Sequence, residues 1–102
     1  MLQIQVQHYD DVPTLSVTGN LTLVEADRIR AIEDHLKPGD ARILLAIAKW
    51  DQAAMETLKS VLRNASRDGV RVTVKVVHGD PLLVLTVGLL DLRPPDDTAY
   101  RA

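Results

Sequence analysis

The chain has 102 residues, 46% of them hydrophobic, which is enough for a single domain with a sizeable core. It contains no cysteine, which excludes disulfides, thiolate chemistry and the usual structural zinc sites. The net charge of −2, with both signs interspersed along the chain, gives no basic surface for nucleic acid.

The N-terminal residues predict an antiparallel hairpin. Residues 2–7 ("LQIQVQ") alternate apolar and polar side chains, as a half-buried strand does, and residues 14–19 ("TLSVTG") alternate again after a turn rich in Asp and Pro. We expect five apolar side chains of this hairpin to point inward: Leu2, Ile4, Val6, Leu15 and Val17.

The next segment changes to a helical period. Thr22 followed by Glu25 fits a capping box, in which the hydroxyl and the carboxylate each accept a hydrogen bond from an amide at the helix start. The sequence "KPG" at 37–39 would end this helix, because Pro cannot continue it and Gly accepts a positive φ. The buried side of the helix would carry Ala26, Ile29, Ile32 and Leu36.

Residues 42–48 ("RILLAIA") predict a second kind of strand. They show no alternation, so we expect both faces of this strand to be covered by crossover helices. A helix follows over residues 52–67, with Asp51 as its N-cap and Gly69 just past its end. Its apolar stripe consists of Ala54, Met55, Leu58, Val61, Leu62 and Ala65.

The last predicted elements are a strand over residues 70–77 and a short helix from residue 81. The strand alternates valines with a polar face of Arg71, Thr73 and Lys75. Asp80 as an N-cap and Pro81 at the first helical position favour a helix, although the valines within residues 81–90 also permit a strand.

The order of elements is therefore ββαβαβα, which predicts an α/β fold with a single mixed β-sheet and crossover helices. Residues 1–92 would form one domain, and the polar, Pro-rich residues 93–102 a flexible C-terminal tail. No apolar run approaches the roughly 18–20 residues of a membrane span, and the N-terminus lacks the features of a signal peptide. We expect a cytoplasmic protein without direct membrane insertion.

No group of residues has the spacing of a metal or catalytic site. His8, His35 and His78 are scattered, without an i, i+4 pair. No glycine-rich loop follows a strand, and no serine stands beside a base in the sequence. We predict no metal, no cofactor and no catalytic residue. Asp51 remains as a candidate, because it follows the most apolar strand, at the sheet edge where α/β proteins bind ligands and partners.

Three stretches carry a resemblance to a known family: "GNLTLVEADRI", "ILLAIAKWDQAAMETLKSVLRNASRDGVRVTVKVV" and "GLLDL". Together they resemble the STAS domain, typified by bacterial anti-sigma-factor antagonists. That family has a Gly-Glu-Leu-Asp element after its second strand and an apolar strand that ends in Asp-Ser-Ser-Gly-Leu. The resemblance implies that the first Ser of this motif is phosphorylated by the partner, an anti-sigma factor that is itself a serine kinase, and that the phosphate breaks the complex.

This chain differs from the family at the phosphorylated position. Asp51 matches the Asp of the motif, Gln52 matches the phosphorylated Ser, and residues 53–55 match the Ser-Gly-Leu. In the earlier element both acids are absent, since Asn20 and Thr22 stand in their places. Gln52 has no hydroxyl, so we expect no phosphorylation there and no release of a partner by this route. The implied partner-binding residues are Asn20, Thr22, Asp51, Gln52, Ala53 and Met55.

Three functions are consistent with the sequence. The first is a non-catalytic, regulatory protein-binding module that resembles an anti-sigma-factor antagonist. The second keeps the fold and is a STAS-type accessory subunit of a bacterial lipid-transport ABC system, bound to its ATPase. The third is an enzyme or small-ligand protein that uses a cleft at the same strand edge, for which a strongly perturbed Asp51 in a deep pocket would be the sign.

Overall fold

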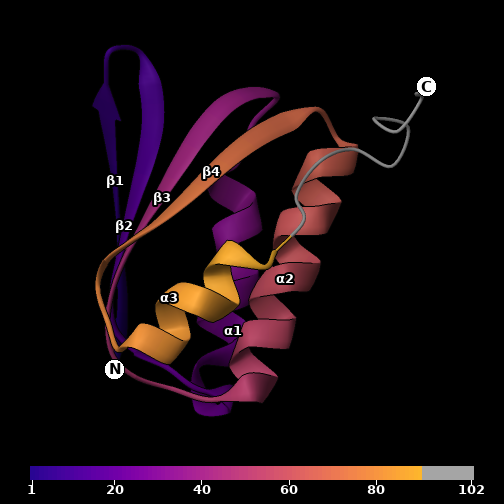
Figure 1. Ribbon diagram of the computed structural model, residues 1–102. Coiled ribbons are helices and arrows are strands. Elements are labelled where there is room, and N and C mark those ends of the chain that lie inside the picture. The colour runs from indigo at the N-terminus through magenta and orange to yellow at the C-terminus, as the bar shows by residue number, and fades with distance from the viewer. Residues whose placement is uncertain (91–102) are drawn as a thin grey trace, which may run out of the picture.

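The computed structural model describes residues 1–90 and contains one four-stranded mixed sheet. The strands lie side by side in chain order (Figure 1). β1 pairs with β2 in antiparallel fashion, whereas β2 with β3 and β3 with β4 are parallel. The predicted α/β class with a single mixed sheet is confirmed. The strands are β1 (Leu2–Tyr9), β2 (Val12–Leu21), β3 (Gly39–Trp50) and β4 (Val70–His78).

The helical segments pack on one side of this sheet (Figure 1). They are the short 3₁₀ helix η1 (Leu23–Glu25), α1 (Ala26–Ala31), the 3₁₀ helix η2 (Ile32–His35), α2 (Gln52–Arg67) and α3 (Pro81–Gly88). None of the helices within residues 1–90 is long and apolar enough to cross a membrane. The tail predicted at 93–102, and the last two residues of the predicted domain, lie outside the described residues.

The predicted hairpin is confirmed, but the inward position predicted for Val6 is wrong. Asp10 and Asp11 both have positive φ, as a two-residue turn between twisted strands requires. Leu2, Leu15 and Val17 are buried, whereas Val6 is 42% exposed although it pairs with Leu15. The reason is its position, because β1 is an edge strand and the turn end of the hairpin projects past the helices (Figure 1).

The two covered faces expected for the central strand are not found. Along β3, Ile43, Leu45 and Ile47 are buried beneath the helices, whereas Leu44 and Ala46 on the opposite face stay partly exposed. No helix of residues 1–90 covers that opposite face (Figure 1). Leu44 is instead flanked by the side chains of its strand neighbours, Ser16 on β2 and Lys75 on β4. The unbroken apolar run thus reflects a central strand with a neighbouring strand on each side, β2 and β4, rather than helices on both faces.

The first predicted helix is broken into η1, α1 and η2, and its capping box is absent. Ile29, Ile32 and Leu36 are buried as expected, and Ala26 only partly. Thr22 makes no side-chain capping bond. The Glu25 carboxylate accepts a hydrogen bond from the Leu2 N–H at 2.8 Å, so it joins η1 to the start of β1. A tertiary partner has therefore taken the carboxylate of the expected capping box, and the Glu25 N–H bonds to the Thr22 carbonyl oxygen instead of its hydroxyl.

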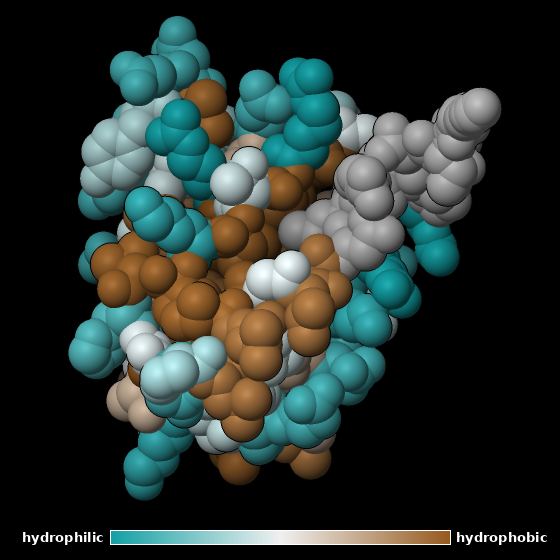
Figure 2. Space-filling model, viewed as in Figure 1, coloured by the Kyte–Doolittle hydropathy of each residue, from teal (hydrophilic) through white to brown (hydrophobic). Residues whose placement is uncertain are grey.

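The two later helices agree closely with the prediction. α2 has the predicted bounds, all six residues of its apolar stripe are buried, and Gly69 takes a positive φ just past its end. The segment that began with Pro81 is a helix, with Asp80 as its N-cap. α3 buries only Leu83 and Val87, and apolar side chains remain exposed on the face of the molecule that it occupies (Figure 2).

Candidate functional site

The candidate site lies where β2 and β3 end at the same edge of the sheet. Leu21 and Trp50, the last residues of these parallel strands, are paired. The next residue, Asp51, donates its backbone N–H to the Leu21 carbonyl oxygen at 3.0 Å. η1 starts two residues after β2, and α2 starts two residues after β3. The first turns of η1 and α2 are therefore neighbours.

The carboxylate of Asp51 joins these two helical segments. Its Oδ1 accepts the Ala54 N–H at 2.8 Å and so caps α2, as predicted, and its Oδ2 accepts the Leu23 N–H of η1 at 3.0 Å. The bond from Ala54, followed by that from Leu23, lowers the pKa of Asp51, because both bonds favour the ionised carboxylate. With one backbone donor on each oxygen, Asp51 acts as a positioning residue.

Asp80 has the same arrangement at the end of the neighbouring strand. Its Oδ1 accepts the Leu83 N–H at 2.7 Å and caps α3, and its Oδ2 accepts the indole N–H of Trp50 at 3.0 Å. These two bonds, that from Leu83 first, lower the pKa of Asp80. The capping role followed from the sequence, but the link to Trp50 did not. Only the parallel pairing of β3 with β4, which brings their carboxyl ends together, could have indicated it.

The structure brings most of the predicted partner-binding residues to this edge. Gln52 and Ala53 are exposed in the first turn of α2, whereas Asn20, Thr22 and Asp51 are half-buried. Met55 is the exception and needs a correction. Its side chain is buried in the core, because it lies on the apolar stripe of α2 that faces the sheet. Met55 is therefore no part of an accessible surface.

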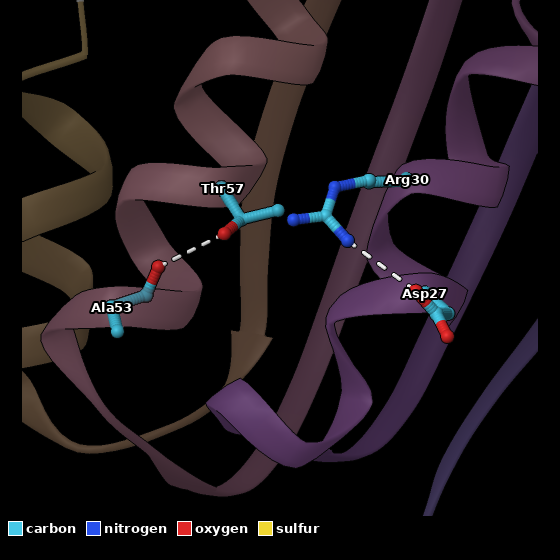
Figure 3. Close-up of polar contacts among 4 residues, drawn as sticks. All are labelled: Asp27, Arg30, Ala53 and Thr57. Atoms are coloured by element: carbon cyan, nitrogen blue, oxygen red, sulfur yellow. Dashed lines mark hydrogen bonds and ion pairs between the residues drawn. The ribbon is translucent and has the colours of Figure 1, made fainter.

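The first turns of α2 satisfy many of their own polar groups. The Gln52 side-chain amide donates to the Glu56 carboxylate at 3.1 Å. One residue later, the Ala53 carbonyl accepts a hydrogen bond from the Thr57 hydroxyl at 3.1 Å, on the side of α2 that Figure 3 shows next to α1. There α1 carries an exposed ion pair of its own, between Arg30 and Asp27 at 3.3 Å (Figure 3).

Sequence reasoning missed two exposed apolar residues of η1. Leu23 is more than half exposed and Val24 is 91% exposed. Neither lies on the helical stripe of residues 26, 29, 32 and 36, and this mismatch is the signal that could have marked them. We define the η1–α2 surface as Asn20, Thr22, Leu23, Val24, Gln52 and Ala53.

The histidines give no metal site in the part of the chain that the structure describes. They are all exposed and lie on β1, η2 and β4. Within residues 1–90 no group of three or more His, Cys, Asp or Glu side chains could hold a metal ion.

Comparison with known proteins leaves the family of this chain open. No protein-family model matches the sequence, and no curated protein matches it. The functional argument therefore depends on the geometry of the sheet edge and on the resemblance of its motifs.

Proposed function

We propose that this chain is a non-catalytic, regulatory protein-binding module of the cytoplasm, similar to the STAS-type anti-sigma-factor antagonists of bacteria. It binds its partner through the η1–α2 surface. One observation supports the proposal most: the Asp51 carboxylate accepts hydrogen bonds from the backbone N–H groups of both Leu23 and Ala54. The exposed apolar residues of η1 are thereby fixed beside the exposed first turn of α2.

The chemistry of the two aspartates favours binding over catalysis. A general acid or base works best with a pKa near the operating pH, which for a carboxyl group means a raised pKa. In Asp51 and Asp80 the pKa is lowered, and each carboxylate is already used by backbone donors of a helix start. Both groups therefore remain ionised and engaged, which suits a structural role at a docking edge.

The composition of the η1–α2 surface supports a protein partner. Its six side chains are apolar, small or uncharged, with Leu23, Val24 and Ala53 exposed among them. Charged residues are depleted at the centre of protein interfaces, where dry packing dominates. Because residue 52 is a glutamine, this surface has no hydroxyl at the family's phosphorylation position and binds its partner without that release signal.

The test is capture of the partner from the source cell by the immobilised 102-residue chain, compared with two surface variants. We expect a kinase-like anti-sigma factor to be retained by the wild type and lost by Val24→Lys. Gln52→Glu should weaken capture by about tenfold, because it adds a negative charge to the contact, next to the Glu56 carboxylate to which Gln52 is hydrogen-bonded. Capture of a transport ATPase instead would support the accessory-subunit function.

A matched control comes from the N-terminal hairpin. Val6→Lys places the same charge on an exposed valine of β1, away from the η1–α2 surface, and should leave capture unchanged. Capture that survives both Val24→Lys and Gln52→Glu, in variants that melt like the wild type, would rule out this surface as the docking site.

A further inference from the structure

β4 is an edge strand, and within residues 1–90 it pairs with β3 alone. The ladder between these two strands begins with the Gly39 N–H, which donates to the Gly69 carbonyl oxygen at 3.0 Å. Backbone groups of successive residues point to alternate sides of a strand, so the odd-numbered residues of β4 continue this ladder. The N–H and C=O groups of Val72 and Val74 therefore point away from β3, to the open edge of the sheet.

On the sheet face away from the helices, β4 presents cationic side chains. Arg71, Thr73 and Lys75 are exposed there and alternate with the valines that face the helices. Arg42 of β3 is paired with Thr73 and lies on the same face. Arg71 forms an ion pair with Asp40 at 2.8 Å, whereas Lys75 and Arg42 form none with any residue of the described chain. On β3 and β4 this face therefore holds more positive than negative charge.

On the other face of the sheet, β4 presents apolar side chains. Val72, Val74 and Val76 pack against the core but are only partly buried. α3, which packs beside β4, continues this apolar side. Figure 2 shows hydrophobic side chains over this part of the molecule. The exposed apolar residues on α3 and just after it are Leu82, Val84, Leu85 and Leu89.

β1, the other edge strand, lacks this combination. Its side chains on the uncovered face of the sheet are uncharged: Gln3, Gln5 and Gln7. Charge therefore distinguishes the two edges. A strand added beside β4 would meet cations on one face of the sheet and valines on the other, whereas a strand added beside β1 would meet only amides on its polar side.

We propose that the edge of β4 binds an extended segment of a partner protein, in which acidic side chains alternate with apolar ones. The segment adds a strand beside β4. Its backbone bonds to the outward groups of Val72 and Val74, its acids face Arg71 and Lys75, and its apolar side chains face the valines and α3. Such binding gains affinity from main-chain hydrogen bonds, so it does not require a large apolar area. The β4 edge is separate from the η1–α2 surface, and its use does not depend on the function proposed above.

Titration of the full chain with two peptides of equal composition tests the proposal. The alternating peptide Val-Glu-Val-Glu-Val-Glu-Val, blocked at both ends, should bind saturably. The segregated peptide Val-Val-Val-Val-Glu-Glu-Glu should bind about tenfold more weakly or worse, because it cannot place its acids on one face of a strand. A chain that does not bind the alternating peptide, or binds both peptides equally, would refute strand addition.

Charge reversal on the protein tests the acidic preference. Lys75→Glu should weaken binding of the alternating acidic peptide by about tenfold or more, and should bind Val-Lys-Val-Lys-Val-Lys-Val better than the wild type does. Gln5→Glu is the matched control, since it adds the same charge to the same sheet face on the other edge strand. Equal effects of the two substitutions would contradict a site at β4.

Amide hydrogen exchange tests the backbone contact itself. Saturation with the alternating acidic peptide should slow exchange at Val72 and Val74 by about tenfold or more, because their N–H groups become bonded. The Thr73 N–H already faces β3, so its exchange should change much less. Binding that leaves Val72 and Val74 unprotected would show contact through side chains alone and overturn the proposal.

Discussion

α2 and α3 begin in the same way and end up in opposite environments. Each follows a parallel strand, and each starts with an aspartate that caps the helix through one oxygen and holds a distant group through the other. α2 then buries an entire apolar stripe, whereas α3 buries two side chains and leaves most of the others exposed. The start of a helix is thus encoded locally, but its contribution to the core depends on the sheet area available beneath it.

The sharpest test of this contrast replaces one leucine in each helix. Leu58→Ala on α2 should cost about 2–5 kcal/mol of unfolding free energy, because it removes a fully buried side chain and leaves a cavity. Leu85→Ala on α3 should cost less than about 1 kcal/mol, since Leu85 is 59% exposed. Equilibrium urea unfolding measures both losses. Similar losses of unfolding free energy for the two variants would contradict the difference between α2 and α3.

The two capping aspartates should differ in their effect on melting. Asp51→Ala uncaps a long, well-packed helix and releases η1, so we expect it to lower the melting temperature by several degrees, and Asp80→Ala to lower it less. Asp51→Asn is the informative control, because its amide oxygen can still cap α2 while its nitrogen cannot accept the Leu23 N–H. An intermediate melting temperature is expected for it, and a wild-type value would show that the link to η1 adds nothing.

Low pH should remove the contributions of Asp51 and Asp80 to stability. Both aspartates have a pKa below the usual value in the folded chain, so their stabilising effect is present above the unfolded pKa of about 3.9 and is lost as the pH falls through the lower folded pKa. The stability difference between the wild type and Asp51→Asn should therefore be constant near neutral pH and shrink below about pH 4. Denaturant unfolding at several pH values measures it, and a difference independent of pH would contradict the shifted pKa.

The smallest expected effect is spectroscopic. The chain has one tryptophan, and its indole N–H is bonded to Asp80. Asp80→Asn should change the position or intensity of Trp50 emission, while Asp51→Asn should leave it nearly unchanged. If both variants shift the emission alike, Trp50 reports on the whole sheet edge and not on the start of α3.

The parts of the fold that follow local rules could be predicted from the sequence. The bounds of α2, its cap at Asp51 and the helix after Pro81 come from periodicity and capping residues that lie close together in the chain. The errors come from long-range partners. The Glu25 carboxylate accepts the Leu2 N–H in place of the expected capping bond, and Asp51 accepts the Leu23 N–H in addition to capping α2; these contacts span 23 and 28 residues.

The candidate surface was only partly predictable for the same reason. Gln52 and Ala53 were expected at an exposed helix start, and they lie there. Met55 was assigned to the surface by motif correspondence, although its place on the apolar stripe indicated the core. Leu23 and Val24 were overlooked because their segment was treated as the start of one continuous helix. Burial and segment breaks depend on what packs nearby, and a linear pattern does not contain that information.

The bond between Glu25 and the Leu2 N–H has a practical consequence. It places the beginning of β1 beside Glu25, the last residue of η1, so a peptide joined ahead of Met1 starts close to the η1–α2 surface. An affinity tag attached there would compete in cis with a docking partner and lower the measured affinity.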